Sequence, residues 1–313
     1  MYYQMKVKSF TNENFNQKIS QKAIISALKN CYRKKAFSTF PYIIGNYSSI
    51  NSINKFNSGN CVALSMYLKD YLKKKYNIKS FLIPATIPRK FSHRDYLNIS
   101  HVSLAIPKNN NTIYIADPAF YFLNPIKVKL NINNTCRVFT KNIYENEVNT
   151  NPKDYTSIDR VICETNKLSE DLKLNDYQLV PKNTHYSKCY FCKDETDIWN
   201  YYLVEILNPD RSISNFFSKI RFEPFIMSTK TDKNGICSPN YHIKVEYDSV
   251  IIRKDNSEIY RFYFEDILSK PDNFKDKIRQ YNLSKFFDED LLDGIIDYIN
   301  DINNNKKKID IHD

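Results

Sequence analysis

The spacing of apolar residues changes near Asn77, and this change constrains the fold more than any other feature of the sequence. From residue 61 to residue 72, apolar side chains recur three and four positions apart, which is typical of an amphipathic helix. After Asn77, three short apolar segments at 78–85, 99–106 and 112–117 have the pattern of β-strands. The order predicts a helix that lies across an antiparallel sheet.

The rest of the chain supports an α+β fold. Residues 15–35 have helical spacing, and strand patterns return from residue 199 onward. We expect an N-terminal helical region at 1–80, an antiparallel, β-barrel-like second part at 81–264, a C-terminal helical region at 265–301 and a polar tail at 302–313. Within the second part, the polar segment 130–190 is expected to be an irregular insertion or a cover.

Composition excludes several classes of function. The chain of 313 residues contains only four glycines, so it lacks the glycine-rich loops with which many nucleotide-binding proteins hold phosphate. The formal net charge of +11 favours anionic partners, such as a phosphate-bearing cofactor, nucleic acid or an acidic surface. Because the basic residues are scattered and accompany no nucleic-acid-binding motif, we expect a solvated basic surface and no nucleic-acid partner.

The cysteine pattern and the absence of long apolar segments favour an intracellular protein. The seven cysteines are odd in number and irregularly spaced, which fits free thiols better than a disulfide framework. No apolar run has the length of a membrane span, and the first residues lack the apolar stretch of a signal peptide. We therefore expect a cytoplasmic location, in a reducing compartment and without a membrane partner.

Three side chains on the predicted helix and strands form a candidate catalytic triad. Cys61 follows the cap-type residue Asn60 and lies in the first turn of the helix, where the helix dipole favours a thiolate. His101 lies on the second strand, and Asp117 ends the third. Neighbouring antiparallel strands can hold the imidazole beside the carboxylate, which fixes its tautomer and stabilises its charge. The spacing predicts a nucleophile, a base and an orienting group.

Other candidate sites are weaker. His93 and Asp95 lie in a charged, loop-like segment, where a solvated or substrate-gating role is expected. His242 stands in a predicted strand among aromatic residues and is expected to be structural. His185, Cys189 and Cys192 could supply three zinc ligands, but no fourth ligand lies nearby, so we expect free thiols and no metal.

The segments SGNCVALSMYLKDYLKKKYNIKSFLIPA, SHVSLAI and NTIYIADPAF resemble the papain-like, transglutaminase-like core shared by transglutaminases and arylamine N-acetyltransferases. The helix-borne Cys61, His101 in an H-x-x-L-x-I strand and Asp117 followed by Phe120 are most similar to the arylamine N-acetyltransferases. The order of the later segments is also similar to that family's second half. The sequence has FNSGNC where the family has Arg-Gly-Gly before the nucleophile, and Ala63 where it has Glu.

The resemblance implies an acyltransferase without a tightly bound cofactor, with acetyl-CoA or another acyl-CoA as co-substrate. It implies that Cys61 takes the acyl group, His101 takes the thiol proton and Asp117 orients the ring. It further implies that Phe120 and Tyr121 line the pocket for an amine acceptor. Two alternatives remain open: a transglutaminase-like cysteine hydrolase or protein crosslinker that acts on amides, and a non-catalytic structural or interaction protein that retains the fold.

Overall fold

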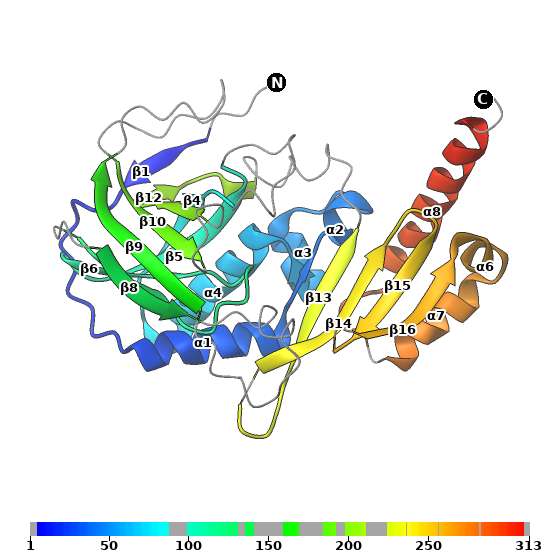
Figure 1. The fold of residues 1–313 in the computed structure, drawn as a ribbon, viewed down its shortest axis with the longest axis horizontal. Coiled ribbons are helices and arrows are strands. Elements are labelled where there is room, and N and C mark those ends of the chain that lie inside the picture. Colours follow the sequence, from blue (N-terminus) through cyan, green and yellow to red (C-terminus); the bar gives the residue numbers. More distant parts are fainter. Residues whose placement is uncertain are drawn as a thin grey trace.

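The computed structural model describes residues 5–87, 99–130, 135–140, 159–168, 184–191, 198–210, 224–235, 237–255, 257–281 and 283–309. Two large sheets lie on either side of a helical layer (Figure 1). Helix α1 and helix α4 belong to this layer and pack against each other. None of the helices in the described ranges is both long and apolar enough to cross a lipid bilayer.

The larger sheet has eight strands in the order β7-β6-β5-β4-β11-β10-β9-β8, and every pairing in it is antiparallel. Its edge strands β7 and β8 approach each other, so the sheet curls into a nearly closed barrel. Its strands are β4 (Phe81–Ala85), β5 (His101–Asn109), β6 (Thr112–Ala116), β7 (Ile126–Lys129), β8 (Thr135–Thr140), β9 (Asp159–Leu168), β10 (His185–Phe191) and β11 (Ile198–Tyr202). A separate pair, β1 (Val7–Ser9) and β12 (Val204–Ile206), is also antiparallel.

The second large sheet has six strands in the order β16-β15-β14-β13-β2-β3. Its strands are β2 (Ala36–Ser38), β3 (Ser58–Gly59), β13 (Phe225–Thr231), β14 (Cys237–Val245), β15 (Ser249–Lys254) and β16 (Ser257–Tyr263). The short strands β2 and β3 pair in parallel, so two N-terminal segments extend a sheet whose other strands come from residues 225–263. The two halves of the chain are therefore joined by backbone hydrogen bonds.

Side-chain and backbone caps explain where the two central helices begin and end. Ser20 accepts a hydrogen bond from the N–H of Ala23 at the start of α1, and Asn60 caps α4 in the same way. Helix α4 ends at Asn77, whose left-handed backbone (φ 52°) is typical of a C-terminal cap. The helices are α1 (Gln21–Lys34), α2 (Phe40–Ile43), α3 (Ser49–Lys55), α4 (Cys61–Tyr76), α6 (Phe264–Ser269), α7 (Pro271–Gln280) and α8 (Glu289–Ile309).

The core has three parts that correspond to these layers. One lies between α1, α4 and the barrel-like sheet and includes Leu28, Leu68 and Leu104. A second fills the space between the six-stranded sheet and the helices α6, α7 and α8, with Phe274 among its members. A third lies on the other face of strand β5 and includes Trp199. Strand β5 is buried on both faces over most of its length, so apolar residues such as Leu104 and Ala105 point to opposite sides of the sheet.

The structure confirms the predicted α+β class with a barrel-like antiparallel sheet. Segment 130–190, predicted as an irregular insertion or cover, contains strands β8, β9 and β10 of the larger sheet. Helix α8 continues to Ile309, into the segment predicted as a polar tail. The division into four regions stays a prediction.

Candidate active site

Cys61 is the first residue of α4, and the segment before it is held by a buried polar network. Asn60 Oδ1 accepts hydrogen bonds from the backbone N–H of Ala63 (3.1 Å) and from Ser49 Oγ (3.2 Å). The backbone N–H of Asn60 donates in turn to the hydroxyl of Tyr42 at 3.1 Å. Because both the side chain and the backbone of Asn60 are tied down, the position of the following sulfur is fixed by the packing around the helix start.

Gly59, the residue before Asn60, is constrained by the packing around it. A Cβ atom on Gly59 would lie 2.5 Å from the Cβ of Ala63 and 2.9 Å from the hydroxyl of Tyr42. Both distances are shorter than a van der Waals contact, so only glycine fits where β3 meets α4 without displacing the helix start. The small side chain of Ala63, where arylamine N-acetyltransferases were expected to have glutamate, is one wall of this tight junction.

His101 begins strand β5, and the register of three strands sets the direction of its side chain. Ala85 on β4 pairs with His101 on one side and with Tyr201 of β11 on the other. Residues paired across a sheet point to the same face, so the imidazole and the phenol lie in one row with a methyl group between them. Asp117 directly follows strand β6, the other neighbour of β5, and its side chain reaches the same row.

The carboxylate of Asp117 is the centre of the site. Its Oδ2 lies 2.7 Å from His101 Nε2 and accepts a second hydrogen bond from the Tyr201 hydroxyl at 2.9 Å. The side chains of His101 and Asp117 are 3% and 0% exposed, so this pair is shielded from water. With Nε2 committed to the carboxylate, Nδ1 is the ring nitrogen left to face another group, and Cys61 is close enough to influence the pKa of the ring.

Electrostatics keep the imidazole positively charged. Burial alone lowers the pKa of His101, but the negative charge and hydrogen bond of Asp117 outweigh it, and Cys61 acts in the same direction. Together they raise the pKa of His101 from its ordinary 6.5 to about 10. A protonated ring beside a sulfur at a helix N-terminus is the arrangement that stabilises a nucleophilic thiolate.

The structure places His101 and Asp117 in direct contact, with Cys61 close enough to raise the pKa of His101, and the catalytic role of the three residues stays a prediction. Cys61 is itself only 2% exposed.

Cys31 is also buried, but it is an inert thiol in the apolar core. Burial raises the pKa of Cys31 to about 12, against a small opposing effect of Lys35, which keeps its thiol protonated at neutral pH.

The two residues predicted to line an acceptor pocket lie beside the site in different ways. Phe120 packs edge-on against the His101 ring, with the ring centroids 4.9 Å apart, and it remains partly exposed. Tyr121 is buried, and its hydroxyl donates to the carbonyl of Met227 (2.6 Å) while accepting from the N–H of Phe37 (2.8 Å). Tyr121 therefore ties the loop after β6 to the six-stranded sheet, and its contact with a substrate stays a prediction.

Tyr201 is a site residue that sequence reasoning missed. It lies 84 positions after Asp117 and belongs to a tyrosine-rich segment in which no position stands out. The side chain is fully buried, as in an ordinary core residue. Only its hydroxyl group, which contacts Asp117, gives it a place in the site. Only the register between β11 and β4 shows that this tyrosine, and not its neighbour Tyr202, faces the carboxylate.

The other candidate residues lie apart from the triad or outside the described residues. His242 packs against Phe225, and burial, with a smaller effect of Arg253 and Lys244, lowers its pKa to about 4. This histidine is neutral at physiological pH. His93 and Asp95 fall outside the described residues.

The three residues considered as possible zinc ligands lie only partly within the residues that the structure describes. His185 and Cys189 lie on strand β10, and Cys192 falls outside the described residues. Within the ranges that the structure describes, no three histidine, cysteine or acidic side chains are grouped so that they could hold a metal ion.

Solved structures share this architecture. The arylamine N-acetyltransferase from Mycobacterium abscessus aligns with a TM-score of 0.53 at 8% sequence identity, over 93% of this chain and 92% of that chain. The chain has the arylamine N-acetyltransferase fold. The enzyme from M. smegmatis aligns with a TM-score of 0.51 at 8% identity, over 92% of this chain and 95% of that chain. No protein-family model matches the sequence, and no curated protein matches it at a significant level. The similarity to the arylamine N-acetyltransferases is therefore one of fold.

Proposed function

We propose that the protein is a cysteine-dependent acyltransferase of the arylamine N-acetyltransferase type. In this proposal it transfers an acyl group from a CoA-like thioester to an amine through an acyl-Cys61 intermediate. The observation that carries the proposal is the buried His101–Asp117 pair, 2.7 Å between Nε2 and Oδ2, with the thiol of Cys61 at the N-terminus of α4 near enough to raise the pKa of the imidazole. The similarity in fold to the arylamine N-acetyltransferases supports it.

The first half-reaction forms the thioester on the enzyme. The thiolate of Cys61 attacks the carbonyl carbon of the donor, and the bond between that carbon and the donor sulfur breaks. The departing thiolate takes a proton from the imidazolium of His101, which leaves the ring neutral. Asp117 holds the ring in place throughout and favours its charged form, and Tyr201 holds Asp117.

The second half-reaction returns the site to its starting state. An amine attacks the acyl carbon, the bond to Cys61 Sγ breaks, and the amine proton passes to the neutral ring of His101. The imidazolium–thiolate pair is then restored. No tightly bound cofactor takes part in this scheme, since the acyl-CoA is a co-substrate.

The start of α4 supplies a group for the negative oxygen that develops in both steps. The first N–H groups of a helix have no partner within the helix. The side chain of Asn60 accepts a hydrogen bond from the N–H of Ala63. We assign the N–H of Cys61 to the oxyanion. Loss of one such donor typically raises the barrier by about 3 kcal/mol.

Intact-mass analysis after exposure to a panel of CoA thioesters tests the proposal directly. The expected result is a mass increase of one acyl group, mapped to Cys61 by peptide analysis, and its loss when an arylamine is added. Cys61→Ser should show no increase, and His101→Ala should acylate far more slowly. Absence of any acyl-Cys61 with every thioester, in protein whose Cys61 still reacts with iodoacetamide, would refute the acyltransferase proposal. A labelled glutamine-containing peptide in a parallel reaction tests the transglutaminase-like alternative.

A further inference from the structure

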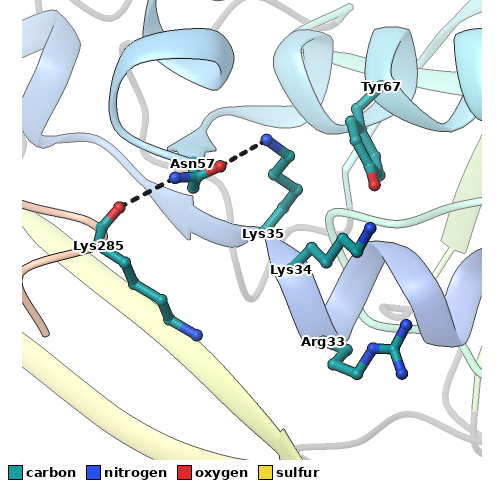
Figure 2. A pocket seen from close by; sticks show the side chains of 6 residues that line it. All are labelled: Arg33, Lys34, Lys35, Asn57, Tyr67 and Lys285. Atoms are coloured by element: carbon teal, nitrogen blue, oxygen red, sulfur yellow. Dashed lines mark hydrogen bonds between the residues drawn. The ribbon is translucent and has the colours of Figure 1, made fainter. Parts of the chain in front are cut away.

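A cavity of about 460 Å³ opens where the end of α1 meets α4 and the segment before α8. Four of its six lining side chains carry a positive charge, and Figure 2 shows them arranged around an open space. The lining residues are Arg33, Lys34, Lys35, Asn57, Tyr67 and Lys285. Three of the four charges are consecutive in the sequence, at the end of α1, and the fold brings Lys285 to them from a distant segment.

The positive charges of this basic pocket are not neutralised within the described part of the chain. Each ion pair found there involves other lysines and arginines, such as Lys55 with Asp288 and Lys275 with Asp293. The guanidinium of Arg33 donates to the amide oxygen of Asn30, a neutral acceptor, which leaves most of its five N–H donors for other partners. Charged side chains gathered without counterions repel one another, and an anion in the cavity removes that repulsion.

Hydrogen bonds to neutral acceptors hold the pocket in shape. Lys35 Nζ donates to the carbonyl of Ile53 (3.0 Å) and to Asn57 Oδ1 (2.8 Å). Asn57 Nδ2 donates to the carbonyl of Lys285 at 3.2 Å, which ties the segment before α8 to the start of β3 (Figure 2). An ammonium group has three donors, so Lys35 has one left for a ligand. The pocket is therefore preorganised at its base.

Two of the lysines are held in surroundings that disfavour their charge. Burial lowers the pKa of Lys35, Cys31 opposes this effect, and the neighbouring Lys34 lowers the pKa further. Burial also lowers the pKa of Lys285. An anion placed among these groups reverses both effects, because a nearby negative charge favours the ammonium form.

We propose that the basic pocket binds the phosphate groups of a small phosphorylated ligand. Arginine binds phosphate through two parallel hydrogen bonds, and lysine binds it as a point charge, so this set of side chains suits phosphate better than a single carboxylate. The volume lies within the range of small-molecule sites. The Tyr67 ring, with Lys35 Nζ 4.9 Å from its centroid, adds a flat surface on which a base or other planar group can stack.

Two sources of phosphate share this chemistry: the phosphorylated end of the acyl donor, and a separate phosphorylated metabolite. Phosphate binding itself does not depend on acyl transfer at Cys61. The identification of the ligand as the acyl donor rests on the proposed function, whereas its identification as a separate metabolite does not. The experiment below separates them.

Isothermal titration of the full chain with inorganic pyrophosphate, in buffer of low ionic strength, tests the proposal. The wild type should bind one pyrophosphate per chain. The double variant Arg33→Gln/Lys34→Gln removes two charges from α1 and should bind at least about tenfold more weakly, since each charged hydrogen bond contributes roughly that much. Lys285→Gln removes a charge from a distant segment and should weaken binding in the same direction.

Lys74→Gln is the matched control. It removes one positive charge from the exposed surface of α4, where the side chain is 81% exposed and its nearest acid is Asp70 at 3.8 Å. This variant should bind pyrophosphate as the wild type does. No saturable binding by the wild type, or equal weakening in the control and pocket variants, would overturn the proposal. Circular dichroism on each variant verifies that the fold is retained, and Lys285→Gln provides an independent test if the double variant does not fold.

Competition then identifies the source of the phosphate. If coenzyme A displaces pyrophosphate and pocket variants raise the KM for an acyl-CoA without lowering kcat, the ligand is the donor. If adenosine bisphosphate and coenzyme A leave pyrophosphate bound, the ligand is a separate metabolite. Cys61→Ser should bind pyrophosphate as tightly as the wild type in either case, so failure of acyl transfer and failure of phosphate binding are distinguishable.

Discussion

Asp117 links three strands through a single carboxylate oxygen. His101 from β5 and Tyr201 from β11 both contact Oδ2, although 84 positions separate Tyr201 from the aspartate. A phenol that donates to a buried carboxylate stabilises its negative charge and limits its movement. Tyr201 is therefore a positioning residue that acts on the imidazole through Asp117.

Replacement of Tyr201 by phenylalanine tests this role. Loss of a hydrogen bond to a charged group should lower the free energy of unfolding by about 1.5–3 kcal/mol. It should also slow alkylation of Cys61 by iodoacetamide, because a less restrained Asp117 holds the imidazolium less firmly. The control is Tyr202→Phe, which alters the next residue of β11 on the opposite face. Equal reactivity of Cys61 in both variants would show that the Tyr201 hydroxyl has only a structural role.

The raised pKa of His101 predicts how stability depends on pH. Below the ordinary value of 6.5, the ring is charged in both the folded and the unfolded protein, and its interaction with Asp117 contributes fully. As the pH rises toward the folded-state value of about 10, the unfolded state loses its proton first and this contribution disappears.

Urea denaturation of the wild type and His101→Gln measures this dependence. The difference in unfolding free energy between the two proteins should be largest near about pH 6 and should shrink steadily toward about pH 10. A difference that grows with pH would mean that the ring is neutral in the folded protein. In that case the imidazolium–thiolate pair of the proposed mechanism would have to be abandoned.

At the scale of single elements, the junction between β3 and α4 has the tightest packing near the nucleophile. Gly59→Ala introduces a methyl group 2.5 Å from the Cβ of Ala63. Overpacking of this kind typically costs about 1–3 kcal/mol, and here it should also displace the helix start and slow alkylation of Cys61. Thermal unfolding and iodoacetamide kinetics measure the two effects.

The double variant Gly59→Ala/Ala63→Gly is the control, because it removes the atom with which the new methyl group collides. It should recover part of the alkylation rate, despite the cost of about 1 kcal/mol that glycine adds inside a helix. If Gly59→Ala alone leaves both the stability and the rate unchanged, the junction is looser than the packing indicates.

Much of this element-scale structure could be predicted from the sequence. The helix Cys61–Tyr76, the strand that bears His101 and the strand that ends before Asp117 follow from short-range periodicity and capping residues. The contact of Tyr201 with Asp117, and the positions within the sheet of the strands in segment 130–190, could not be predicted in this way. Their places depend on pairing between distant segments, and periodicity carries no information about which strands become neighbours.

At the scale of the whole molecule, the triad lies inside the packing between the helical layer and the barrel-like sheet. Cys61 is 2% exposed, so a reagent reaches the sulfur only through a narrow approach or a local opening. We expect iodoacetamide to react with Cys61 at neutral pH, and a bulky maleimide to react much more slowly. Peptide mapping by mass spectrometry, with Cys31 as the unreactive reference, measures both rates. Equal rates with the two reagents would contradict this account of access.

The same whole-molecule view explains why the basic pocket was not predicted. The sequence indicates a net charge of +11 and scattered lysines, which favours an anionic partner without locating it. Only the fold brings Arg33 and Lys285 to one cavity, since they are far apart in sequence. The fold class, in contrast, was predictable, because the helix and strand patterns extend over most of the chain.

The low exposure of the sulfur also affects how long a covalent intermediate can last. A thioester in bulk water is lost by hydrolysis, which wastes the donor whenever no acceptor is present. An acyl group on the buried sulfur of Cys61 would be reached by few water molecules. In the proposed mechanism, the acyl-enzyme would then persist until it meets an amine of low abundance. The packing of the site would determine the lifetime of the acyl-enzyme as well as the rate of its formation.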